Sequence, residues 1–90
     1  MDWECAILKT YESLGGRAYN KQVYGRVTAF YPLNAFHLRV NSRWGDRAMY
    51  THTVRKFISM LADPKRGELR RITNGLHELT AKGRQRVTRC

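Results

Sequence analysis

The sequence predicts an α+β fold in which a three-helix core is followed by a two-stranded C-terminal β-hairpin. Apolar residues recur at helical spacing in three separate segments of the 90-residue chain. A glycine pair or a proline stands where each of these segments should end. Asn74-Gly75, the strongest short signal for a β-hairpin, separates two strand-like segments near the C-terminus. A chain of this length forms one domain with a modest core.

The first helix is predicted over residues 2–14. Its apolar side chains fall at positions i, i+4, i+8 and i+11 and therefore share one face: Trp3, Ile7, Tyr11 and Leu14. Asp2 and Glu4 lie in the first turn, where the helix dipole favours negative charge. Gly15-Gly16 then ends the helix, because glycine tolerates the left-handed backbone of a C-terminal cap.

The second helix is predicted over residues 20–31, with Asn20 as its N-cap and Pro32 as its stop. Its apolar stripe consists of Val23, Val27 and either Phe30 or Tyr31. The segment 33–45 allows two interpretations, which the sequence leaves open. Asn34 could cap a short helical turn, whereas the alternation of Phe36, Leu38 and Val40 with polar residues is typical of a strand. Trp44 is either a core residue or a residue that stacks on a base or sugar.

The third helix is predicted over residues 46–62 and is stopped by Pro64. Its apolar stripe has helical spacing throughout: Tyr50, Val54, Phe57, Ile58 and Leu61. The opposite side carries basic and hydrogen-bonding side chains: Arg47, Thr51, His52, Arg55, Lys56 and Ser59. No acidic residue follows Asp46 in this segment, so we expect one basic face to point outward.

The hairpin is predicted around Asn74-Gly75, because both central residues of a type I′ turn need positive φ. A two-residue turn places Arg71 opposite Glu78, a favourable cross-strand charge pair. Ile72 and Leu79 then share the face that we assign to the core. The domain is expected to cover residues 1–84, followed by a basic, flexible tail at residues 85–90.

The charge of the chain predicts an anionic partner. Seventeen Lys and Arg residues face seven Asp and Glu residues, which gives a net charge of +10. Twelve of the seventeen basic residues are arginine, which suits bidentate recognition of phosphate and guanine. No apolar run approaches the length of a membrane span, so no membrane partner is expected.

The two cysteines, Cys5 and Cys90, lie near opposite ends of the chain and form neither a disulfide framework nor a Cys-x-x-Cys zinc motif. We expect them to be reduced thiols. The N-terminus is acidic and lacks the basic start of a signal peptide. We therefore expect a cytoplasmic protein, in the cell interior and in some cases associated with the nucleoid.

The segment that follows the hairpin carries a resemblance to a known family. Leu79-Thr80-Ala81-Lys82-Gly83 resembles the Leu-Thr-x-x-Gly run that closes the second wing strand of many winged helix-turn-helix domains. The segment between the second and third helices is similar to the N-terminal domain of Mrr-type restriction endonucleases, with Leu33-Asn34 where that family has Leu-Ser. The resemblance implies a DNA-binding domain without the nuclease half, and the third helix here is more basic than in the family.

A winged helix predicts non-catalytic binding of double-stranded DNA, with the third helix in the major groove and the hairpin on the backbone. The candidate DNA contacts are Arg43, Arg47, Thr51, His52, Arg55, Lys56, Arg70, Arg71, Asn74 and His77. Such a domain serves either as the targeting module of a restriction or defence system or as a transcription regulator. It acts as a homodimer or with a fused or separate effector domain. Two alternatives remain, namely RNA or ribosome binding and interaction with an acidic protein.

No catalytic residue, metal site or cofactor is expected. Asp63, Lys65 and Glu68 have the residue types of a metal-dependent nuclease site, but they flank Pro64 and Gly67, which indicate a turn. His37, His52 and His77 show no spacing typical of metal ligands.

Overall fold

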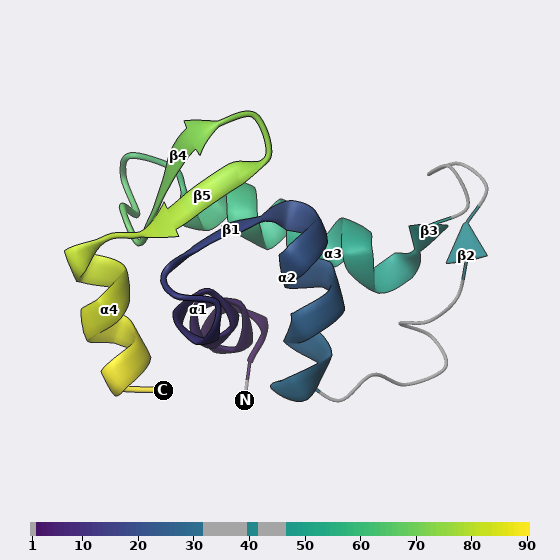
Figure 1. The fold of residues 1–90 in the computed structure, drawn as a ribbon, viewed down its shortest axis with the longest axis horizontal. Helices are drawn as coiled ribbons and strands as arrows, with labels where there is room; N and C mark the ends of the chain where they lie inside the picture. The colour runs from purple at the N-terminus through teal and green to yellow at the C-terminus, as the bar shows by residue number, and fades with distance from the viewer. Residues whose placement is uncertain (1, 32–39, 42–46) are drawn as a thin grey trace.

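The structure is a computed structural model that describes residues 2–31, 40–41 and 47–90. These residues form a small α+β fold with four α-helices and a three-stranded antiparallel sheet (Figure 1). The elements in chain order are α1 (Trp3–Ser13), β1 (Arg17–Tyr19), α2 (Asn20–Arg26), the 3-10 helix η1 (Val27–Ala29), β2 (Val40–Asn41), β3 (Arg47–Ala48), α3 (Met49–Leu61), β4 (Leu69–Thr73), β5 (Leu76–Leu79) and α4 (Ala81–Thr88).

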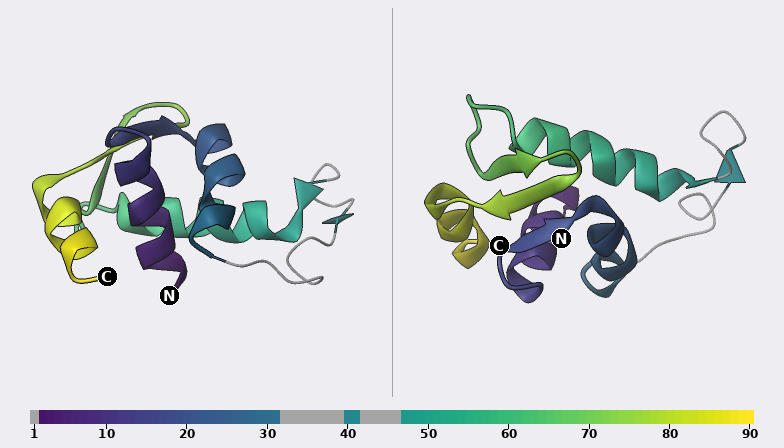
Figure 2. Two further views of the ribbon diagram at one scale, coloured as in Figure 1. Left: turned by 60° about the horizontal axis from the view of Figure 1, so that its bottom comes forward. Right: turned by 45° about the horizontal axis from the view of Figure 1, so that its top comes forward.

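The three-stranded sheet has the strand order β1-β5-β4, and both pairings are antiparallel. The last strand therefore lies in the middle, between its hairpin partner β4 and the early strand β1. A second, two-stranded ribbon pairs β2 with β3, directly before α3. Figure 2 shows this ribbon at the far end of α3 from the three-stranded sheet.

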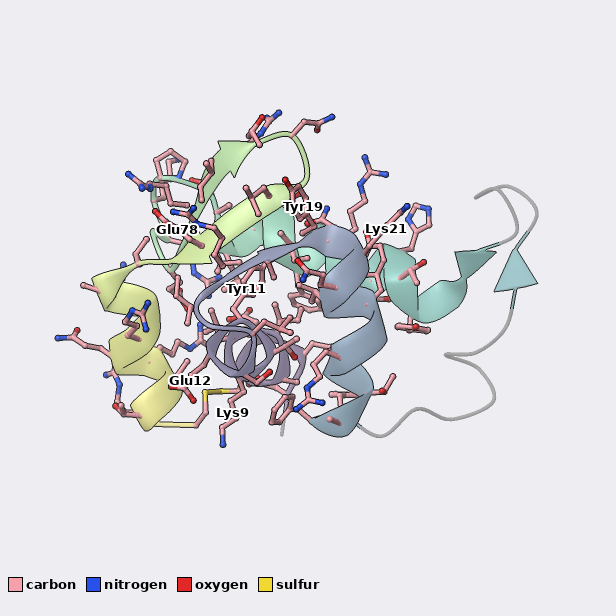
Figure 3. The ribbon with its side chains drawn as sticks, viewed as in Figure 1. Lys9, Tyr11, Glu12, Tyr19, Lys21 and Glu78 are labelled. Carbon is pink, nitrogen blue, oxygen red and sulfur yellow. A yellow bond between two sulfur atoms is a disulfide. The ribbon has the colours of Figure 1, made fainter. Side chains whose placement is uncertain are left out.

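The core surrounds α1, which contacts α2, α3, α4 and the strands β1 and β5 (Figures 1 and 2). Tyr11 of α1 points into this interior, whereas Lys9 and Glu12 point away from it (Figure 3). The buried apolar side chains come from all four helices, η1 and all three strands of the sheet: Ala6, Ile7, Leu8, Tyr11, Ala18, Val23, Val27, Val54, Ile58, Leu61, Leu69, Leu79 and Val87.

The predicted first helix is confirmed. Asp2 caps it, since its Oδ1 accepts a hydrogen bond from the backbone N–H of Cys5 at 2.8 Å. Gly15 and Gly16 end it with φ angles of 88° and 92°, which only glycine adopts without strain. Trp3 at its start stacks on Tyr31, with ring centroids 3.8 Å apart, and so holds the end of η1 against α1.

The predicted second helix is shorter than expected and is preceded by a strand that the sequence did not indicate. α2 ends at Arg26, and the chain continues as η1 instead of an α-helix up to Tyr31. The N-cap is Tyr19, not Asn20, and the Gln22 side chain accepts a hydrogen bond from the Tyr19 backbone N–H at 2.8 Å. Of the three residues in β1, only Ala18 is buried, so this strand leaves little apolar pattern to detect.

The predicted third helix is confirmed from Met49 onward but not at its start. Residues 47–48 pair with residues 40–41 in a ribbon, so Arg47 belongs to β3 and not to the outward stripe of the helix. Val54, Ile58 and Leu61 are buried, and Tyr50 and Phe57 pack against them as predicted. The strand at Val40 agrees with one of the two interpretations of the segment 33–45. The predictions for residues 33–39 and for Arg43 and Trp44 lie outside the described residues.

The predicted hairpin is present around Asn74-Gly75, but its register and core face were predicted wrongly. A β-bulge between Arg71 and Thr73 adds one unpaired residue, so Arg70, not Arg71, lies opposite Glu78. Because side chains alternate along a strand, this shift reverses the faces beyond the bulge. Ile72 is therefore 40% exposed, and Leu69 is the residue that faces Leu79 in the core.

The expected flexible tail at residues 85–90 is wrong, because the chain forms α4 up to Thr88. The Thr80 hydroxyl caps this helix by accepting a hydrogen bond from the Gly83 N–H at 3.1 Å. Val87 is buried against α1. The expected reduced thiols are also wrong, because α4 brings Cys90 beside α1, where it forms a disulfide with Cys5 (Figure 3). Within the described ranges, no helix has the length and apolar character that a bilayer crossing requires.

Candidate nucleic-acid interface

A groove of about 1050 Å³ lies between α2, α3 and the β4–β5 hairpin. Three elements that are distant in sequence therefore contribute to one concave surface, which we call the groove. Its described lining residues are Asn20, Lys21 and Tyr24 of α2; Tyr50, Thr51, Arg55, Ile58, Ser59 and Ala62 of α3 and its end; and Arg71, Asn74, Gly75 and His77 of the hairpin.

Hydrogen bonds hold the walls of the groove in place. The backbone N–H of Asn20 donates to the Gly75 carbonyl at 2.9 Å, which ties the start of α2 to the hairpin turn. The Tyr50 hydroxyl donates to the Tyr24 carbonyl at 3.1 Å, which ties α3 to α2. Gly75 has a φ of 78°, so the turn that receives the first bond depends on glycine. The groove is thus formed before any ligand arrives.

Three cations line the groove without an ion-pair partner among the described residues. Lys21, Arg55 and Arg71 come from α2, α3 and β4 respectively, and all three side chains are exposed. Figure 3 shows Lys21 on α2, close to α3 in that view. None of the described lining residues is acidic. The concave shape and the single sign of charge favour an anionic ligand.

His77 lines the same groove but is only 8% exposed. In the sheet its backbone lies between Ala18 of β1 and Arg71 of β4. Its Nδ1 has no hydrogen-bond partner in the described part of the structure, and neither has the buried Oδ1 of Asn20. Burial, and then the positive charge of Arg71, lower the pKa of His77 below its ordinary value of 6.5, so the imidazole is neutral at pH 7.

Arg66 and Arg86, unlike Arg55 and Arg71, form ion pairs among the described residues and do not line the groove. Arg66 binds Glu4 at 2.6 Å and Glu68 at 3.0 Å, and Arg86 binds the same two carboxylates at 2.7 and 2.6 Å. Burial opposes the charge of Glu4, but its hydrogen bonds from Arg66 and Arg86 outweigh burial and lower its pKa. This four-residue cluster joins α1, the α3–β4 connection and α4.

Glu78 forms a second cluster, on the strand face opposite His77. It accepts hydrogen bonds from Arg70 and from Arg17, the latter at 3.2 Å, and both lower its pKa. Arg70 is therefore engaged in an ion pair across the sheet, whereas its neighbour Arg71 lines the groove.

The groove brings together half of the ten residues that the sequence predicted as DNA contacts. Thr51, Arg55, Arg71, Asn74 and His77 all line it. His52 and Lys56 lie on α3 without lining the groove, and Arg70 pairs with Glu78. Arg47 lies in β3, and Arg43 is outside the described residues. His77 was expected to reach the DNA backbone from the hairpin surface, but the structure places it at the buried end of the groove.

Sequence reasoning missed the contribution of α2 to the groove, namely Asn20, Lys21 and Tyr24. These residues meet the hairpin because β1 pairs with β5, and no residue pattern at Arg17–Tyr19 indicates a strand. The only available hint was a lysine directly after a helix-capping type of residue, which by itself is a common surface pattern.

The residues considered for a nuclease site serve structural roles. The Asp63 Oδ1 accepts a hydrogen bond from the Lys65 backbone N–H at 2.8 Å and so closes the turn after α3. Glu68 is 5% exposed and is held by Arg66 and Arg86. In the ranges that the structure describes, no three His, Cys, Asp or Glu side chains form a group that could hold a metal ion.

Comparison of this chain with protein-family models, with curated proteins and with solved structures found no match. The resemblance to winged-helix and Mrr-type domains therefore stays a prediction from the sequence. The function has to be inferred from the geometry and charge of the groove.

Proposed function

We propose that this protein is a non-catalytic domain of winged-helix type that binds double-stranded DNA through the groove and the adjoining surface of α3. One observation carries the proposal. Lys21, Arg55 and Arg71, from three different elements, surround one concave surface on which no described acidic residue lies. Phosphates of a DNA backbone are the ligand that such a surface favours, because each cation that meets a phosphate releases a condensed counterion.

The order of the elements supports the winged-helix interpretation. A helix, a short strand, two further helices and a C-terminal hairpin follow one another, and the short strand β1 lies beside the last strand β5. This order is typical of winged helices. In that interpretation α3 is the recognition helix and the β4–β5 hairpin is the wing. The ribbon β2–β3 and the additional helix α4 are elaborations of this chain.

The length and the residues of α3 suit insertion of this helix into the major groove of DNA. The helix has 13 residues and is therefore about 20 Å long, and the major groove of B-DNA is about 12 Å wide. Thr51, Arg55 and Ser59 recur every four residues, so they share one face of α3, and all three line the groove of the protein. Lys56 is exposed beside them. Arginine can bridge O6 and N7 of guanine, so Arg55 is the proposed base-reading residue.

The wing supplies backbone contacts in this proposal. Arg71 and Asn74 line the groove from the hairpin, opposite α3. Lys21 approaches from α2. Contacts of this kind set the position of a protein on the duplex and contribute affinity without reading sequence.

Within the cell the domain would act as the targeting part of a defence system or as a transcription regulator, alone as a homodimer or with an effector domain. The proposal needs no metal and no cofactor. It implies action in the cytoplasm or on the nucleoid, where disulfides are rare. The Cys5–Cys90 disulfide would then have to withstand the reducing thiols of that compartment.

A fluorescence-anisotropy titration against labelled duplex DNA, duplex RNA, single-stranded DNA and a polyglutamate peptide tests the proposal. We expect duplex DNA to bind tightest at 100 mM salt. Preference for either RNA or single strands would contradict DNA-duplex binding. Binding to polyglutamate alone would show that the groove serves an acidic protein partner instead.

A further inference from the structure

We infer that a backbone phosphate of the bound duplex lies in the groove against the imidazole of His77, and that binding therefore takes up one proton. This inference rests on the proposed function and adds a partner atom and a pH dependence to it. Among the described polar side chains that line the groove, His77 is the one whose charge can change near neutral pH.

In the proposed complex the groove receives one backbone strand of the duplex. The sugar-phosphate backbone is the ridge between the major and minor grooves of B-DNA. With α3 in the major groove and the hairpin against the backbone beside it, that ridge has to pass between the two elements. The groove lies between the same two elements. A phosphate on the ridge is therefore the ligand group that reaches deepest.

The buried end of the groove offers polar atoms that lack a partner. Nδ1 of His77 and Oδ1 of Asn20 have no hydrogen-bond partner in the described part of the chain. An unpaired polar atom inside a protein is unfavourable, and a ligand that supplies its partner recovers the cost. A phosphate oxygen accepts hydrogen bonds, so it can pair with an N–H of His77 but not with the Asn20 Oδ1, which is itself an acceptor. A protonated His77 has two N–H donors, and phosphate oxygens are acceptors. The imidazolium and the phosphate thus complement each other.

Burial, and after it the positive charge of Arg71, keep His77 neutral in the free protein. The basic lining residues are Arg71 of β4, Lys21 of α2 and Arg55 of α3, and the aromatic ones are Tyr24 of α2 and Tyr50 of α3. Tyr11 of α1 is also neutral, since burial raises its pKa. On β1 the residue beside His77 is Ala18, and Arg17 next to it pairs with Glu78 on the other face.

A bound phosphodiester reverses this electrostatic setting. Its negative charge offsets that of Arg71, and an opposite charge beside the imidazole favours the protonated form against the cost of burial. The imidazole takes a proton from solvent and then donates an N–H to a phosphate oxygen. No covalent bond forms or breaks, and the complex carries one proton more than the free protein and free DNA together.

The test measures the pKa of each histidine by NMR, first in the free protein and then in the complex with duplex DNA. Signals are assigned with the single variants His37→Gln, His52→Gln and His77→Gln. We expect the pKa of His77 to rise by at least one unit on binding, and the affinity for duplex to rise about tenfold between pH 7.5 and pH 5.5. Titration calorimetry in buffers of different ionisation enthalpy should give a proton uptake that is largest between the two pKa values, about half a proton per complex for a rise of one unit.

The variants separate His77 from the other histidines. His77→Gln should abolish most of the proton uptake, whereas His52→Gln, on the same helix face as the predicted contacts, should retain it. Duplex binding with an unchanged pKa of His77 would overturn the inference and leave the proposed function standing. Proton uptake that disappears with His52→Gln would also overturn it. No duplex binding at either pH would contradict both, and the wild-type NMR titration gives its answer even if His77→Gln fails to fold.

Discussion

The groove and the Glu4–Arg66–Glu68–Arg86 cluster beside α4 use the same residue types in opposite ways. On the α4 side, Arg66 and Arg86 are paired with Glu4 and Glu68, and a disulfide fixes the end of the helix to α1. On the groove side, Lys21, Arg55 and Arg71 have no described carboxylate to pair with. The paired arginines, Arg66 and Arg86, hold secondary-structure elements together. The unpaired cations in the groove are available to a ligand. A net charge of +10 thus contains both structural and functional arginines, which composition alone does not distinguish.

The disulfide should have the largest effect on the α4 side. Cys5 and Cys90 are separated by 85 residues, so the bond restricts almost the whole unfolded chain. The double variant Cys5→Ser/Cys90→Ser should lower the free energy of unfolding by about 2 to 5 kcal/mol, as should reduction of the wild type. Urea denaturation with and without dithiothreitol measures this loss. Equal stability under both conditions would show that the bond does not hold α4 in place.

Gly83 should have the next largest effect. A Cβ at this position would clash with the backbone carbonyl oxygen of Glu68, which is not the end of a flexible side chain and cannot move aside easily. Gly83→Ala should cost about 1 to 3 kcal/mol through overpacking.

Gly25 is the matched control for this variant. It also lies in a helix, but a Cβ there meets nothing within 4 Å. Gly25→Ala should stabilise the domain by about 0.5 to 1 kcal/mol. If thermal unfolding showed the same change for both variants, the close approach of α4 to the chain at Glu68 would be refuted.

Arg71 and Arg70 are adjacent in β4 and allow a direct comparison of an unpaired arginine with an ion-paired one. Arg71 lines the groove, whereas Arg70 pairs with Glu78. Arg71→Ala should weaken binding to every duplex about tenfold, as expected for one lost charged contact of about 1.4 kcal/mol. Arg70→Ala should change affinity much less. Anisotropy titrations of both variants against two unrelated duplexes test this. A larger loss for Arg70 would mean that the opposite face of the sheet contacts DNA.

The stability of the free domain should depend weakly on pH because of His77. Its pKa is lowered in the folded state, so below about pH 6.5 the unfolded chain binds a proton that the folded protein does not. Unfolding free energy should therefore fall as the pH drops from 6.5 towards the folded-state pKa, by at most about 1.4 kcal/mol per pH unit. His77→Gln should remove this slope. If the free energy of unfolding instead rose as the pH dropped over this range, the folded protein would stabilise a histidine in its charged form.

Sequence patterns predicted the helices well wherever a continuous apolar stripe marked a buried face. The stripes of α1 and α3 are examples, and Asn74-Gly75 located the hairpin for a comparably local reason. β1 was missed because a three-residue strand with one buried alanine has almost no period. The register of the hairpin was missed because a bulge at Ile72 depends on packing of Leu69 and Leu79, not on the turn residues.

The C-terminal helix shows why composition can mislead. Residues 81–88 are polar except for Ala81 and Val87 and contain a glycine, so they resemble a solvated tail. Val87, the close contact at Gly83 and the bond to Cys5 depend on α1 and on the chain near Glu68, which are distant in sequence. In the candidate site, the α3 residues followed from helical spacing. Asn20 and Lys21 did not, because only the sheet brings them to the hairpin.

The salt dependence of duplex binding tests most directly whether the groove is the DNA-binding surface. Two triple variants remove the same charge from opposite sides: Lys21→Ala/Arg55→Ala/Arg71→Ala from the groove, and Lys82→Ala/Arg84→Ala/Arg89→Ala from α4. For the wild type, log K should fall against log salt with a slope of about −5 to −6 if five to seven phosphates are neutralised. We expect the groove variant to lose about 2 from that slope, since Lys21 and Arg71 are the proposed phosphate contacts, and the α4 variant to keep it. Circular dichroism confirms that both variants are folded. Equal losses in the two variants, or a wild-type slope shallower than about −2, would contradict binding through the groove.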